Sequence, residues 1–174
     1  MRLDRYEDFI TEEERLSLID WMDNSGKLVP GLSRGEFGYS GRKTTRLNEE
    51  TILFPKEAYD IQNRIMDLYG FKMGDVERIA KGSGMISVVT YPGGDTYKHT
   101  DPIVGNKHAM RANIVLQKPE EGGELYVAGN HIPLKEKELH CYCATKYEHW
   151  VTEVIGSKTR YIWLFGFEVD ESLW

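Results

Sequence analysis

Cysteine is scarce in this chain: Cys141 and Cys143 are the only two among 174 residues. They stand two apart in a strand-like stretch, where their Cα atoms would lie about 6.5–7 Å apart and suit a disulfide poorly. A metal site built on this pair would need further ligands, and none is obvious. A disulfide-stabilised scaffold is therefore excluded, and we expect two small buried thiols in a reducing compartment.

Long apolar runs and a surplus of basic residues are also missing. No stretch of about 18 apolar residues is present, which excludes a membrane-spanning helix. The segment that begins at Met1 lacks the apolar core of a secretory leader. The 22 Lys and Arg residues are outnumbered by 28 Asp and Glu, for a net charge of −6, which disfavours broad nucleic-acid binding but allows a local basic patch. We expect a cytoplasmic protein that binds neither membranes nor nucleic acid.

Two helices are predicted near the N-terminus. The first follows a capping box at Thr11–Glu14 and extends to about Asn24, and the second covers Pro55–Tyr69 with Gly70 as its stop signal. The expected apolar stripes are Leu16, Ile19 and Met22 in the first helix and Ala58, Ile61, Ile65 and Leu68 in the second.

Beyond about residue 75 the pattern changes to short strands and turns. Strands are predicted at 84–91, 110–117, 123–128, 137–143, 149–154 and 160–169. In the last of these, Arg160 shares a face with Ile162 and Leu164, whereas Trp163 and Phe165 share the other. Helices followed by strands predict an α+β fold in which the helices pack on one face of a sheet that closes into a jelly roll.

The most informative motif is His99-Thr-Asp101, followed by His149 and then Arg160. Two imidazoles and one carboxylate bind one face of a non-haem Fe(II) and leave the opposite positions open for a co-substrate and O2. Structural zinc would instead favour four protein ligands. An arginine beyond the last ligand can hold a carboxylate of the co-substrate in a bidentate pair. The spacing therefore indicates an oxygenase.

Three segments resemble motifs of the prolyl-hydroxylase-like 2-oxoglutarate/Fe(II) oxygenases. They are Tyr91–Asp101, the Gly-Gly-Glu-Leu run 122–125, and His149–Arg160, in the order and spacing of that family. The resemblance covers roughly residues 84–168 and implies a double-stranded β-helix. It implies one domain over residues 1–174, with 1–80 as helical support and lid and 84–168 as the catalytic barrel.

The same resemblance assigns roles to individual residues. His99, Asp101 and His149 would bind iron, and Arg160 would pair with the 5-carboxylate of 2-oxoglutarate, to which Tyr91 would also donate its hydroxyl group. A further hydroxyl partner is in question, because the strand 111–117 lacks the tyrosine that several relatives carry. Asn113 or Gln117 are the candidates to replace it.

The implied reaction is hydroxylation of an unactivated C–H bond, with release of succinate and CO2. It uses Fe(II), 2-oxoglutarate and O2, with ascorbate as a supporting reductant. The resemblance favours a prolyl or other peptidyl substrate, whereas the short chain favours a free amino acid or another small metabolite. The alternative function is a non-catalytic metal-binding sensor or interaction module on the same barrel.

The segment 25–48 gives a clue to the substrate. It contains five glycines and five Lys or Arg residues against a single acid, Glu36. Glycine-rich connections of this length are often lids or binding loops. We expect a lid that recognises an anionic or zwitterionic substrate through Arg34, Arg42 and Arg46. The alternative interpretation is a solvated surface loop.

Overall fold

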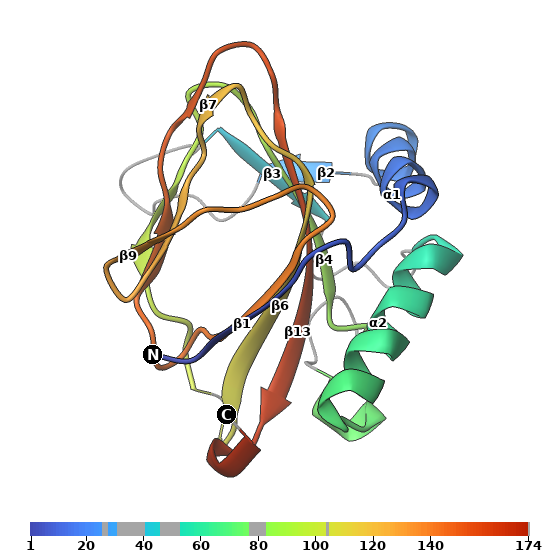
Figure 1. Cartoon of the computed structure of the whole chain (residues 1–174), viewed down its shortest axis with the longest axis vertical. Helices are drawn as coiled ribbons and strands as arrows, with labels where there is room; N and C mark the ends of the chain where they lie inside the picture. The colour runs from blue at the N-terminus through green and yellow to red at the C-terminus, as the bar shows by residue number, and fades with distance from the viewer. Residues whose placement is uncertain (26–27, 31–40, 46–52, 77–82, 104, 174) are drawn as a thin grey trace.

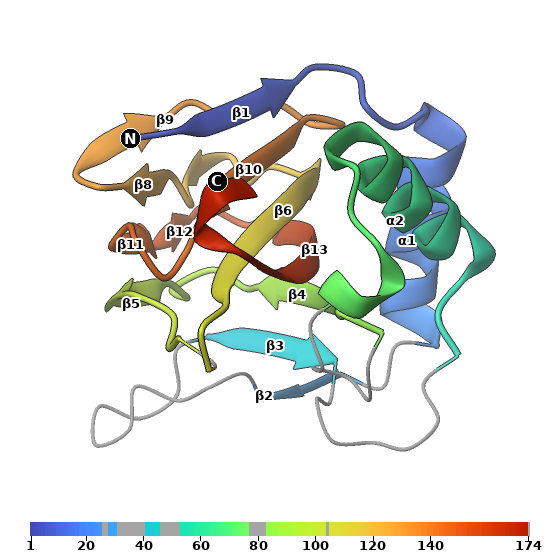
Figure 2. The same cartoon turned by 90° about the horizontal axis from the view of Figure 1, so that it is seen from below.

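The chain folds into two facing β-sheets with two helices on the outer side of the larger sheet (Figures 1 and 2). The computed structural model describes residues 1–25, 28–30, 41–45, 53–76, 83–103 and 105–173. Every strand pair recorded among these residues is antiparallel. None of the helices in this part of the chain is both long and apolar enough to cross a membrane.

The larger sheet has seven strands and the smaller has four. In spatial order the larger sheet contains β1 (Leu3–Tyr6), β10 (Leu139–Cys143), β6 (His108–Gln117), β13 (Arg160–Val169), β4 (Met85–Thr90), β3 (Arg42–Thr45) and β2 (Leu28–Pro30). The smaller sheet contains β5 (Thr96–His99), β11 (His149–Val151), β8 (Leu125–Val127) and β9 (Asn130–Ile132), and β12 (Val154–Ile155) pairs with β7 (Glu121–Gly122).

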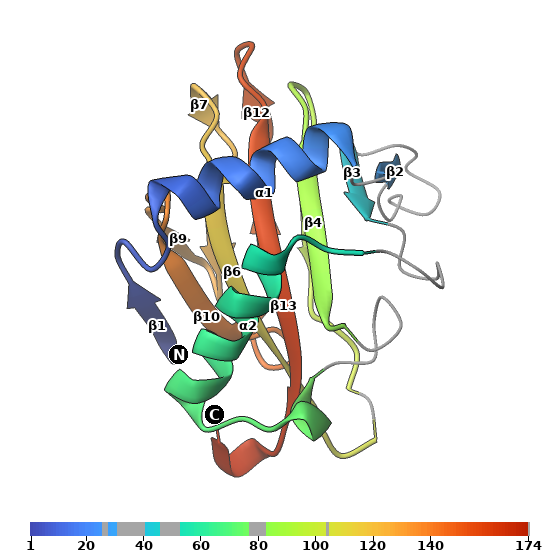
Figure 3. The same ribbon diagram turned by 90° about the vertical axis from the view of Figure 1, so that its right-hand side faces the viewer.

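The helices begin and end where the local signals predict. Helix α1 covers Glu12–Asn24 and starts with the reciprocal capping box of Thr11 and Glu14. Helix α2 covers Lys56–Tyr69 and ends at Gly70, which has a left-handed backbone. Both helices lie on the same side of the larger sheet (Figure 3). Short 3-10 turns follow at Met73–Asp75 and Glu171–Leu173.

The apolar stripes of the helices were predicted only in part. Leu16 is 51% exposed, and Leu18 is buried in its place together with Met22. Leu68, at the end of α2, is 43% exposed, whereas Ala58 and Ile61 are fully buried. Packing on the sheet sets the rotation of each helix about its own axis. Apolar residues that this rotation turns away from the sheet, such as Leu16 and Leu68, stay exposed.

The protein has two apolar cores, one on each side of the larger sheet. The outer core lies between this sheet and the helices and contains Trp163, Phe165 and Phe167 of β13. The inner core lies between the two sheets and includes Val88 and Ile162 from the larger sheet, with side chains of β8 and β11 from the smaller one. The alternation predicted for the last strand is therefore confirmed.

The first eighty residues contribute strands as well as helices. Three strands of the larger sheet, β1, β2 and β3, come from this region, and the lid expected there stays a prediction. The segment 25–48 contains both β2 and β3, and its other described residues are few. Strand β3 pairs with the outer edge of β4, because the backbone N–H and C=O groups at that edge need partners. Cys141 and Cys143 are free and buried, as predicted.

Candidate metal and co-substrate site

His99 and His149 lie directly opposite each other on neighbouring antiparallel strands of the smaller sheet. Their Cα atoms are register partners between β5 and β11. Partners in an antiparallel pair project from the same face, and the two ring centroids are accordingly 4.3 Å apart. Residues fifty positions apart in sequence are thus brought together by a single strand pairing.

Each of these imidazoles is oriented by a backbone carbonyl two residues before it. Nδ1 of His99 lies 2.7 Å from the oxygen of Tyr97, and Nδ1 of His149 lies 3.0 Å from the oxygen of Tyr147. A carbonyl oxygen can only accept, so each Nδ1 carries the proton and each Nε2 keeps a free lone pair. This tautomer is the one that binds metals through Nε2.

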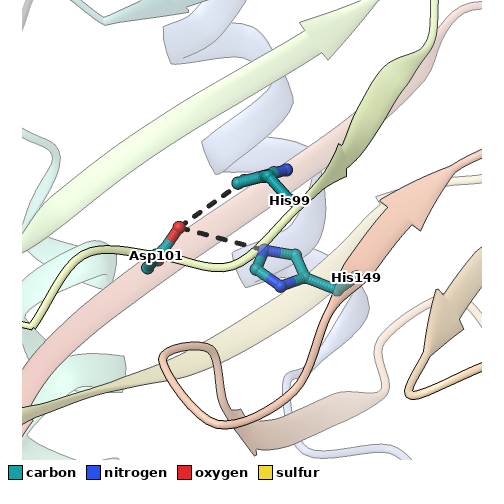
Figure 4. A group of neighbouring side chains, drawn as sticks. All are labelled: His99, Asp101 and His149. Atoms are coloured by element: carbon teal, nitrogen blue, oxygen red, sulfur yellow. Dashed lines mark ion pairs between the residues drawn. The ribbon is translucent and has the colours of Figure 1, made fainter.

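Asp101 completes the group (Figure 4). Its Oδ1 lies 3.5 Å from Nε2 of His99 and 4.0 Å from Nε2 of His149. Its backbone N–H donates to the oxygen of Ala144 at 3.0 Å, which anchors it beside the end of β10. The ligand atoms of the three residues all lie within 4.8 Å of one another.

The charges of this group favour a cation between the three side chains. Burial alone would raise the pKa of Asp101, but the hydrogen bond with His99 and the charge of Arg111 hold it below its usual range. The hydrogen bond with Asp101 raises the pKa of His99, whereas burial lowers that of His149. Two nitrogens, one carboxylate oxygen and a remaining open side are the donor set that Fe(II) takes in oxygenases.

These three residues open onto a cavity of about 280 Å³ between the two sheets. Arg160, the first residue of β13, lines the same cavity and is 6% exposed. Burial, followed by the charge of Arg42, lowers the pKa of Arg160 to about 10. No carboxylate among the described residues forms an ion pair with it. A buried cation without an anionic partner is costly, so this side chain is suited to receive an anion.

Gly123 makes room for the side chain of Arg160. A Cβ at this position would lie 2.8 Å from Cγ of Pro119 and 3.0 Å from Cδ of Arg160. Its φ of +62° also favours glycine. The Gly-Gly-Glu-Leu run therefore acts on the site through the space that it leaves for Arg160.

The three arginines predicted to bind substrate fall into two groups. Arg42 lines the cavity, from the first position of β3. Arg34 and Arg46 lie outside the described residues. The proposed roles of all three remain predictions.

The structure does not support the role predicted for Tyr91. On β4, Ile86 and Val88 line the cavity, whereas Val89 belongs to the outer core. Tyr91 follows β4 two positions after Val89 and lies on the same side of the sheet. Its ring packs against the outer core and lines a different hollow, beside the end of α1. The Lys43 ammonium lies 5.2 Å from the centre of this ring. The phenol is thus on the wrong face of the strand to meet a ligand in the cavity.

Tyr142 provides a hydroxyl group inside the cavity that the motifs did not reveal. It projects from β10 beside His149, with ring centroids 5.2 Å apart, and lines the cavity with Asn113. Burial raises the pKa of its phenol, and a hydrogen bond with Asn113 opposes the rise. Gln117, the other candidate on β6, donates instead to the oxygen of Thr159 at 2.8 Å.

Two more cavity residues were not predicted. His140 projects from β10 two positions before Tyr142, and Arg111 projects from β6. One sequence signal was available: His140 and Tyr142 alternate with the apolar Leu139, Cys141 and Cys143, so the two polar side chains share a face.

Among the comparisons with known proteins, only the one with solved structures gives matches. No family model and no curated protein sequence matches the chain. Among solved structures, a viral collagen prolyl hydroxylase from Paramecium Bursaria Chlorella virus-1, in complex with 2OG, is similar with a TM-score of 0.67 and 14% identity. The match covers 98% of this chain and 97% of that one. A prolyl-4-hydroxylase from Pseudomonas putida gives a TM-score of 0.69 at 13% identity, over 97% of this chain and 92% of that one. The chain thus shares the fold of these two prolyl hydroxylases.

Proposed function

We propose that this protein is an Fe(II)- and 2-oxoglutarate-dependent dioxygenase that hydroxylates an unactivated C–H bond of an amino-acid or prolyl-type substrate and releases succinate and CO2. One domain, residues 1–174, would carry the activity, with the double-stranded β-helix of residues 84–168 as its catalytic part. Two free, buried thiols suit a reducing compartment such as the cytoplasm.

One observation carries the proposal: the three facing ligand atoms share one cavity with the buried Arg160, for which the described residues provide no ion-pair partner. In it, His99 and His149 would bind the metal through Nε2, and Asp101 would bind it through Oδ1. Fe(II), when bound, supplies the redox centre that couples decarboxylation of 2-oxoglutarate by O2 to oxidation of the substrate. Arg160 would hold the 5-carboxylate of 2-oxoglutarate through two parallel hydrogen bonds.

The other cavity residues would orient the co-substrate and exclude water. Tyr142 and Asn113 lie on the neighbouring strands β10 and β6 and can complete the polar contacts that Tyr91 does not make. The rest of the wall is largely apolar: Ile86, Val88, Leu125, Val151, Ile162 and Leu164. An apolar wall keeps solvent away from the reacting atoms and strengthens the charge pairs inside.

Anaerobic addition of Fe(II) and 2-oxoglutarate tests the proposal, because chelation of this acid to iron gives a weak visible charge-transfer band. We expect the band in the wild type, its loss in His149→Ala and a higher 2-oxoglutarate requirement in Arg160→Ala. Succinate release with a substrate would then separate an enzyme from a metal-binding module. A folded wild type that gives no band would contradict the proposal.

A further inference from the structure

Arg42, Thr90 and Arg160 form a row across three adjacent strands. Thr90, the last residue of β4, is the register partner of Arg42 on β3 at one side and of Arg160 on β13 at the other. Register partners in antiparallel strands project from the same face. Both arginines accordingly line the cavity that contains the metal ligands.

Neither arginine of this row has an anionic partner among the described residues. Nε of Arg42 and Oγ1 of Thr90 are buried and have no hydrogen-bond partner there. Arg111 differs, because its guanidinium lies 2.7 Å from the Asp101 carboxylate. A buried donor without an acceptor costs about 1–3 kcal/mol. The row is therefore incomplete without acceptors from a ligand.

Two guanidinium groups offer ten N–H donors between them, more than the roughly four lone-pair sites of a single carboxylate can accept. The proposed function assigns the 5-carboxylate of 2-oxoglutarate to Arg160, which leaves Arg42 without a partner. The ionisable side chains that line the cavity include three arginines against one aspartate. The two positive charges of Fe(II) and the two negative charges of 2-oxoglutarate cancel, so the loaded cavity keeps its positive excess.

Arg42 and the three proposed metal ligands line one and the same cavity. An anion held by Arg42 would therefore lie in the cavity in which the substrate is oxidised.

Resting on the proposed function, we propose that Arg42 binds a carboxylate of the primary substrate, and that this substrate is a small free carboxylic acid of the amino-acid class. A planar guanidinium matches a carboxylate in a bidentate pair. The cavity of about 280 Å³ must also hold 2-oxoglutarate, which leaves room for a small molecule. An internal residue of a peptide carries no carboxylate at its backbone and would leave Arg42 unpaired.

The binding step can be tested without turnover. Protein labelled with ¹⁵N-arginine is loaded with Zn(II) and 2-oxoglutarate, and the Nε–H resonance of Arg42 is identified by its loss in Arg42→Gln. The twenty standard L-amino acids are then added one at a time, each beside its carboxamide. We expect at least one acid to shift this resonance saturably while its amide does not. Calorimetric titration, which does not depend on this resonance, should show the affinity for that acid fall about 10- to 100-fold in Arg42→Gln.

Arg64→Gln is the matched control, because it removes a partly exposed guanidinium from α2 and should leave affinity for the acid unchanged. A panel in which no acid shifts the resonance, or in which acids and amides bind equally, would overturn the assignment of Arg42. A loss of 2-oxoglutarate affinity in Arg42→Gln as large as that in Arg160→Gln would also overturn it, by placing Arg42 on the co-substrate. If the wild type still gives the charge-transfer band, these outcomes overturn only the role of Arg42. If the wild type gives no band, the proposed function itself fails.

Discussion

Arg111 contacts the Asp101 carboxylate on the side opposite to the histidines. Its Nη2 lies 2.7 Å from Oδ2, whereas Nε2 of His99 and of His149 face Oδ1. The two carboxylate oxygens thus have separate partners, which fixes the orientation of the group. Such outer contacts commonly tune the affinity of a metal ligand.

Replacing Arg111 with Gln should weaken metal binding about 10- to 100-fold, because Asp101 would lose both its charge partner and its fixed orientation. Competition titration with Fe(II) or Zn(II) measures the change. Arg2→Gln, which breaks a more exposed ion pair with Asp4, should leave the affinity unchanged. Wild-type affinity in Arg111→Gln would show that the orientation of Asp101 does not depend on this contact.

Gly123→Ala should raise the requirement for 2-oxoglutarate, since the new Cβ would press on Cδ of Arg160. Gly129→Ala is a matched control: its φ is +78°, also in the left-handed region, but a Cβ there would meet no atom within 4 Å. Both variants should lose stability because of the left-handed backbone, and Gly123→Ala should lose more, because its Cβ would also press on Pro119 and Arg160. Only Gly123→Ala should raise the concentration of 2-oxoglutarate that gives half of the maximal charge-transfer band. An equal increase in both variants would contradict a specific effect on Arg160.

Metal binding should stabilise the fold, because His99 and His149 come from paired strands and Asp101 from the segment that follows β5. A ligand at a hundred times its dissociation constant adds about 2.7 kcal/mol to the free energy of unfolding. Thermal unfolding with Zn(II) and with a chelator measures the difference. His99→Ala should abolish it, whereas His131→Ala, which removes an exposed imidazole from β9, should retain it. An undiminished shift in His99→Ala would place the metal elsewhere.

The grouping of His99, Asp101 and His149 was predictable because it depends on one short motif and one strand pairing. His99 and Asp101 stand two apart, and one strand pairing brings His149 to them. The face of Arg160 was predictable for a similar reason, since β13 alternates cleanly between the cavity and the aromatic outer core.

The roles of Tyr91 and Tyr142 were harder to assign. Tyr91 matches the family motif, but its face depends on where β4 ends and the following turn begins. All five residues of β10 are buried, because this strand lies between the outer core and the cavity. Tyr142 and His140 alternate with apolar residues, but a strand buried on both sides gives no exposed face from which to infer which set lines a cavity. Arg42 was identified by composition alone, and its place in the row required the pairing of β3 with β4.

His140 should make the stability of the protein depend on pH. Burial, followed by the charges of Arg160 and Arg5, lowers its pKa to about 3, from an ordinary value of 6.5. Between these values the unfolded chain binds a proton that the folded chain does not. The free energy of unfolding should therefore decrease as the pH falls, by about 1.4 kcal/mol per pH unit from this residue.

Urea unfolding at pH 7.5 and pH 5, with a chelator present, isolates this contribution when the wild type is compared with His140→Gln. The variant has no imidazole to protonate at this position, so between the two pH values it should lose about 2 kcal/mol less than the wild type. His99 and His149 titrate in both proteins, and their effects cancel in the comparison. His131→Gln, which changes an exposed residue of β9, should lose as much as the wild type. If His140→Gln also showed the full wild-type loss, the proton taken up on unfolding would belong to another group, and His140 would not be held neutral beside Arg160.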